Sequence, residues 1–208
     1  MKNKRSIIVI VVLLLFIVGG VFGYMYYKSH KPVEEVPDNK PELVEAIDAY
    51  GYKLEDRDTE LFKGIFEELK AVLSEEIIDY SKYAELLSKL YIVDVYTISN
   101  KLSKYDVGGG DYVNPEYRDN YELKLRDTLY KSVEDNSSNT RNQDLPEVAS
   151  IEVISVDENS YSIGENKYSG YKVSLKWEYI KEEEYDKEAT VYLIKEKDKL
   201  FVVEQKKA

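Results

Sequence analysis

The chain has 208 residues, of which 40 are acidic and 29 basic; it holds one histidine and no cysteine, and its formal net charge is −11. The lack of cysteine excludes disulfides, thiolate metal sites and a thiol nucleophile, and the single histidine, His30, precedes the folded part, so we expect no metal site and no cofactor. The acidic surplus argues against nucleic-acid binding, because phosphates would be repelled.

The N-terminal segment has the length and composition of a membrane span. Residues 7–27 carry no charge and would extend about 31 Å as a helix. Three basic residues precede this run, which by the positive-inside rule keeps the N-terminus in the cytoplasm. The competing interpretation is a cleaved signal peptide, because Val21 and Gly23 have the spacing that signal peptidase prefers. We expect an uncleaved, single-pass anchor over residues 1–27 in the cell membrane, with the remainder extracytoplasmic.

A tether separates this anchor from one folded domain. Residues 28–41, KSHKPVEEVPDNKP, hold three prolines and little apolar content, which is typical of a semi-rigid, extended linker. Residues 42–208 are long enough for a single domain with its own core. The part after the anchor carries 26 basic against 40 acidic side chains, a net charge of −14.

The first half of this domain has helical periodicity. A short strand is predicted over Tyr50 to Leu54, followed by an amphipathic helix that Asp58 would cap. A second helix is predicted from about Ser81 to Ser103, with apolar residues on two sides, so it should be the most buried one. The third is expected to begin at Pro115, and its apolar residues recur every four positions up to Val133.

The second half has the period of two that β-strands show. In YKVSLKWEY, residues 171–179, apolar and polar side chains alternate, which indicates one buried face. Further strands are expected over Val148–Val156, Glu188–Lys195 and Leu200–Glu204. Short polar connections favour an antiparallel meander. The sequence therefore predicts an α+β domain, with about three helices on one face of a curved sheet of about four strands.

The stretch DVGGGDYV, residues 106–113, raises the question of a ligand-binding loop. It lacks the Gly-Lys-Ser/Thr ending of a phosphate loop and the alternating oxygen ligands of a calcium loop. Asp106 and Asp111 flank the glycines and are the weak candidates here. We expect a helix C-cap followed by a flexible connection, because glycine permits the positive φ that such a reversal requires.

Asp94 is the main candidate site residue, because helical phase puts its carboxylate near the middle of the apolar stripe of the second helix. A buried charge is costly unless it is paired, hydrogen-bonded or neutral. The functional interpretation is an acid of raised pKa, or a polar anchor, at the base of a pocket. The structural interpretation pairs Asp94 with a tyrosine hydroxyl or with Arg118 or Arg126 of the next helix.

Two stretches, YGYKLEDRDTELFKGIFEELKAVL and YIVDVYTISNKLSKYDVGGGDYV, resemble a group of uncharacterised membrane-anchored extracytoplasmic proteins of Gram-positive-type bacteria and their wall-less relatives. The resemblance brings no known activity or catalytic residues. At the level of fold, helices followed by a curved sheet resemble the cone-shaped nuclear transport factor two-like fold. That fold hosts enzymes, ligand binders and scaffolds, including single-pass assembly proteins of conjugative secretion systems, so it does not select a function.

Two functional hypotheses follow. The first is a non-enzymatic binding or assembly module on the outer face of the membrane, with a protein partner or with itself. The second is a pocket domain that binds or turns over a small molecule through Asp94 and tyrosine hydroxyls. A cavity that reaches Asp94 would favour the second, and a surface patch rich in tyrosine would favour the first.

Overall fold

The structure is a computed structural model that describes residues 40–182 and 184–207. The predicted anchor and most of the tether lie outside these residues. Within the described ranges, none of the helices combines the length and the apolar character that crossing a membrane demands.

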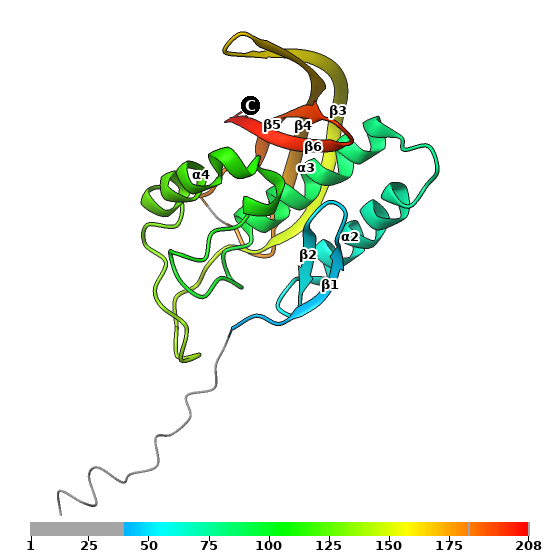
Figure 1. Ribbon diagram of the computed structural model, residues 1–208. Helices are drawn as coiled ribbons and strands as arrows, with labels where there is room; N and C mark the ends of the chain where they lie inside the picture. The colour runs from blue at the N-terminus through cyan, green and yellow to red at the C-terminus, as the bar shows by residue number, and fades with distance from the viewer. Residues whose placement is uncertain (1–39, 183, 208) are drawn as a thin grey trace, which may run out of the picture. The chain divides into compact units, whose positions relative to one another are not determined.

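The described chain is an α+β domain with three α-helices and a curved, four-stranded antiparallel sheet, as the sequence predicts (Figure 1). The helices are α2 (Glu60–Leu73), α3 (Tyr80–Tyr96) and α4 (Pro115–Asp127), with a short 3-10 turn η1 (Gly110–Tyr112) before α4. The sheet consists of β3 (Val148–Ile163), β4 (Asn166–Tyr179), β5 (Glu188–Glu196) and β6 (Lys199–Lys207). A separate hairpin, β1 (Leu43–Ile47) with β2 (Tyr52–Glu55), precedes α2.

The sheet is a meander in which the strands follow one another in the order β3-β4-β5-β6. β3 and β4 form a long hairpin, and β5 pairs with β4 only from Gly170 onward. We call residues 159–169 of this hairpin the arm. In Figure 1 the arm curls past the end of β5 toward β6. The predicted alternation is confirmed, since Val173, Leu175 and Trp177 are buried and Lys176 is exposed.

Helix α3 is the most buried helix, as expected, with eleven of its seventeen residues buried. It packs against the inward face of the sheet, where Tyr96 lies against Trp177 with ring centroids 4.7 Å apart, and α2 packs against it. Helix α4 has no fully buried residue and is joined to α3 by partly buried side chains such as Tyr121 and Leu125. One side of α4 therefore remains open.

Two predicted helix ends are wrong. Helix α3 ends at Tyr96 and not near Ser103, because the amides of Ile98 and Ser99 both bond to the carbonyl of Pro146, just before β3. Helix α4 ends at Asp127 and not at Val133.

The cap of α2 is also corrected. Thr59, and not Asp58, caps this helix, because Thr59 Oγ1 accepts a hydrogen bond from the amide of Phe62. Asp58 instead accepts a hydrogen bond from the amide of Glu55 and closes the turn between β2 and α2. Strand β1 was not predicted at all; its two outermost residues, Leu43 and Val44, are about 60% exposed, so it lacks the alternation of a strand with one buried face.

Candidate functional site

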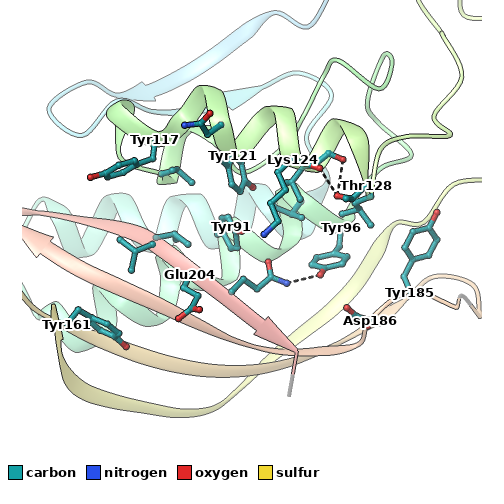
Figure 2. A pocket seen from close by; sticks show the side chains of 18 of the residues that line it. Tyr91, Tyr96, Tyr117, Tyr121, Lys124, Thr128, Tyr161, Tyr185, Asp186 and Glu204 are labelled. Carbon is teal, nitrogen blue, oxygen red and sulfur yellow. Dashed lines mark hydrogen bonds between the residues drawn. The ribbon is translucent and has the colours of Figure 1, made fainter. Parts of the chain in front are cut away.

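A groove with a volume of about 1090 Å³ lies between α4 and β6 (Figure 2). Its floor is α3, which contributes Tyr91, Val95 and Tyr96. One wall is α4 and the other is β6, and in Figure 2 Tyr161 of the arm and Tyr185 of the β4–β5 connection lie at opposite ends. The groove is thus built from segments that lie far apart in the sequence.

Tyrosine is the characteristic side chain of this groove. Burial raises the pKa of Tyr91, Tyr96 and Tyr121, so their hydroxyls keep their protons and remain hydrogen-bond donors at neutral pH. Tyr121 donates to the carbonyl of Gly108 at 2.9 Å, and Tyr96 accepts from the side-chain amide of Gln205 at 2.7 Å. Six tyrosines line the groove: Tyr91, Tyr96, Tyr117, Tyr121, Tyr161 and Tyr185.

The β6 wall of the groove is an edge of the sheet. Val202 forms an isolated parallel bridge with Val113, which covers the first part of that edge. Beyond Val202, the register shifts at Val203, which has no partner in β5, and Glu204 to Lys207 pair with β5 on one side. No strand of the described chain pairs with this stretch on the other side. Such an edge presents unpaired amides and carbonyls in a row. Val203, Glu204 and Gln205 of this stretch line the groove.

Acidic residues outnumber basic ones among the side chains that line the groove. Glu184, Asp186 and Glu204 are acidic, whereas Lys124 is the basic member of the lining. Ion pairs with the end of β6 offset part of this charge, since Lys206 lies 3.0 Å from Glu204 and Lys207 lies 2.7 Å from Asp186. Both pairs are well exposed to solvent and therefore weak.

Asp94 lies outside this groove. Its Oδ1 is 2.5 Å from Nζ of Lys101, and its Oδ2 accepts a hydrogen bond of 2.6 Å from the amide of Gly109. The predicted partners, Arg118, Arg126 or a tyrosine hydroxyl, are therefore wrong for Asp94. Arg118 lies 3.6 Å from Asp111, and Arg126 lies 3.3 Å from Asp127.

Lys101 was missed because the sequence places it in the same helix as Asp94. Residues seven apart in a continuous helix lie on one side but about 10 Å apart along the axis, too far for a direct ion pair. Because α3 ends at Tyr96, the chain turns back and brings Lys101 beside Asp94. The lysine side chain is only 3% exposed, so the pair belongs to the interior.

The glycine loop is packed against α3, so the predicted C-cap and flexible connection are wrong: Thr97 caps the end of α3, and Gly109 precedes the 3-10 turn η1. Gly109 has φ of +83°, and a Cβ built there would lie 2.7 Å from Cγ2 of Val95 and would overlap the hydroxyl of Tyr121. A Cβ on Gly108 would overlap the carbonyl oxygen of Asp94. These two glycines let the backbone approach α3 closely enough to reach the Asp94 carboxylate.

Asp106 anchors the start of this loop. It binds the guanidinium of Arg57 and accepts a hydrogen bond of 2.8 Å from the amide of Leu102. Burial alone would raise the pKa of Asp106, but the hydrogen bonds and charge of Arg57 outweigh burial and hold that pKa below its ordinary value. Asp111 lies farther along, 4.0 Å from Nζ of Lys53. Both aspartates thus have protein partners.

Comparison with protein-family models, curated proteins and solved structures finds no match to this chain. Among the residues that the structure describes, no three His, Cys, Asp or Glu side chains gather as metal ligands would.

Proposed function

We propose that this chain is a non-enzymatic binding module that is held at the cell membrane by its N-terminal segment and takes a protein partner in the α4–β6 groove. The observation that carries the proposal is the combination of six tyrosines with a free sheet edge in one groove. Tyrosine supplies a large, amphipathic contact surface at low cost in side-chain entropy, and it is enriched where proteins bind one another.

The chemistry of the groove favours binding over catalysis. The described side chains that line it supply hydroxyl donors, valine and leucine surface, and acids of which Glu204 and Asp186 are in solvent-exposed ion pairs, rather than a nucleophile beside a base. The small-molecule hypothesis relied on Asp94, which is paired with Lys101 and does not line the groove. We therefore favour a polypeptide partner.

Site-specific photo-crosslinking in cells tests this proposal. A benzophenone amino acid replaces Tyr117, which lines the groove and is 43% exposed, or Ile154 on β3, which is 59% exposed and lies outside the groove. We expect a discrete crosslinked protein from position 117 and none from position 154. The same adducts from both positions, or none from position 117, would contradict the proposal.

A further inference from the structure

We propose that the partner binds as an extended, positively charged peptide that adds a fifth strand to the sheet along β6. This inference rests on the proposed function, because it names the kind of partner that the α4–β6 groove takes. The atoms that bind the peptide are the backbone groups of Val203 to Lys207 on the side away from β5.

The free edge determines that the partner's backbone is extended. Val113 bridges to Val202, so a five-residue stretch of β6 follows without a neighbour among the described strands. At about 3.4 Å per residue this stretch is about 17 Å long. An added strand would form main-chain hydrogen bonds with those amides and carbonyls of β6 that point away from β5. Exposed sheet edges recognise peptides in this way. A segment of five to seven residues therefore fits.

The walls of the groove determine that the partner is a peptide and not the sheet edge of a second folded domain. Tyr117 and Tyr121 on α4 and Tyr161 on the arm border the same groove as Val203 (Figure 2). An extended peptide fits between these walls. If two copies of the chain paired edge to edge through β6, their α4 helices would come into contact before the two β6 strands could meet. Pairing of two copies through β6 is therefore disfavoured by shape.

The two faces of the added strand would meet different surroundings. Gln205 bonds to Tyr96 of α3, so its side chain faces the floor, where Tyr91, Val95 and Leu125 offer aromatic and apolar contacts. Glu204 pairs with Lys206, which lies over the ring of Tyr192 on the outward face of β5. Because side chains alternate along a strand, the partner should place apolar residues on the floor and basic residues beside Glu204.

Charge complementarity selects a basic peptide over an acidic one. Residues 40–208 hold 24 basic and 37 acidic side chains, a net charge of −13. At the groove itself, Lys124 together with Lys206 and Lys207 of the edge balances Glu184, Asp186 and Glu204, so the attraction comes from the charge of the whole domain. That charge attracts a basic peptide and repels an acidic one as it approaches.

The experiment titrates the full-length chain, in micelles of a non-ionic detergent, with three synthetic peptides. The first is acetyl-KVKYKVK-amide. The second has the same side chains but carries N-methyl groups on its internal amides, which removes the donors from both strand edges. The third, acetyl-EVEYEVE-amide, reverses the charge. Calorimetric titration into empty micelles supplies the baseline.

We expect the basic peptide to bind, the N-methylated peptide to bind at least tenfold more weakly, and the acidic peptide to bind no more tightly than the N-methylated one. Glu204→Lys should weaken the basic peptide about tenfold, because it places a cation beside the added strand. Glu178→Lys, the same charge change on the exposed face of β4 and outside this groove, should change its affinity less than twofold.

Three results would overturn the inference. Equal binding of the N-methylated peptide would exclude strand addition, and equal binding of the acidic peptide would exclude charge selection. No binding of the basic peptide at 1 mM would exclude both. None of these results would remove a crosslink from position 117, so failure of this inference is distinguishable from failure of the proposed function.

Discussion

Lys101 is the charged residue most withdrawn from solvent in the described chain, and Asp94 is its counter-charge. An ammonium in such a site is tolerated because Asp94 Oδ1 lies 2.5 Å away, while the amide of Gly109 satisfies the other carboxylate oxygen. The pair links the end of α3 to the loop that follows it. The pair therefore has a structural role and does not line the groove.

Removing Asp94 tests this role. Asp94→Ala should lower the free energy of unfolding by about 3 kcal/mol, because it leaves Lys101 buried without a counter-charge. Asp94→Asn should cost nearly as much, since an amide does not neutralise a lysine. The measurement is urea unfolding of residues 40–208, which contain every described helix and strand. Asp119→Ala, on the exposed side of α4, is the control and should stay within about 0.5 kcal/mol.

A double-mutant cycle separates the pair from other effects. Asp94→Ala combined with Lys101→Met should recover part of the loss, because no unpaired charge remains in the interior. If the two single losses of unfolding free energy simply added in the double variant, the Asp94–Lys101 ion pair would not be what stabilises the contact between α3 and the loop.

Asp58 makes stability depend on pH. Burial raises its pKa to about 6 in the folded chain, above the 3.8 of an exposed aspartate. The folded state therefore binds this proton more tightly than the unfolded state, so Asp58 costs stability above pH 6, and the cost disappears as the pH falls toward 3.8. Asp58→Asn should gain stability relative to the wild type at pH 7 and lose that advantage at pH 4.

The readout is the difference between wild-type and variant unfolding free energies at the two pH values. Asp119→Asn serves as the matched control, because Asp119 lies exposed on α4. A constant difference for Asp58→Asn from pH 4 to pH 7 would mean that the carboxyl is not desolvated.

At the scale of elements, a strand or helix was predictable wherever its apolar residues recur with a single period and so form one buried face. The alternation of residues 171–179 determines which face of β4 is buried, and the apolar stripe of α2 determines its orientation. The end of α3 was not predictable, because apolar residues continue past Tyr96 while the backbone leaves the helix to bond with Pro146. The amide of Ile98 bonds to a residue 48 positions away, and such a long-range hydrogen bond leaves no pattern in the local sequence.

The groove was predictable only in its parts. Tyr117 and Tyr121 show helical spacing, and the strand over Leu200 to Glu204 shows its period of two, but nothing in either pattern places β6 beside α4. That neighbourhood follows from the order of four strands in the sheet and from the packing of α4 on α3. Helical phase identified Asp94 as a carboxylate on an apolar face, but it did not predict Lys101 as the partner.

The loop between α3 and α4 is packed against α3, and substitutions of its glycines test how tightly. Gly109→Ala should lower the free energy of unfolding by about 2–4 kcal/mol, because φ of +83° disfavours a side chain and the new Cβ would overlap Tyr121. Gly110→Ala is the matched control. A Cβ there meets only side chains, the nearest being a carboxylate oxygen of Glu122 at 3.0 Å, so the change should stay below about 1 kcal/mol. Equal, small effects would indicate a loose loop.

At the scale of the whole molecule, the chain combines an acidic domain, a groove rich in tyrosine and an N-terminal segment with the composition of a membrane anchor. An anchor of this kind would hold the domain at the membrane surface. A partner there would need to expose only a short peptide in order to bind. The described fold agrees with the expected class, an α+β domain with three helices and a curved, four-stranded antiparallel sheet. The resemblance to the nuclear transport factor two-like fold stays a prediction.

Co-purification from membranes, followed by quantitative mass spectrometry, tests whether the α4–β6 groove holds the protein partner. The full-length wild type is compared with Asn120→Arg, which puts a bulky cation into the groove, and with Asp119→Arg, its exposed neighbour outside the groove. We predict one protein that is enriched with the wild type and with Asp119→Arg and is lost with Asn120→Arg, although the control carries the larger charge change. Retention of that protein by Asn120→Arg would show that the partner does not bind in the α4–β6 groove.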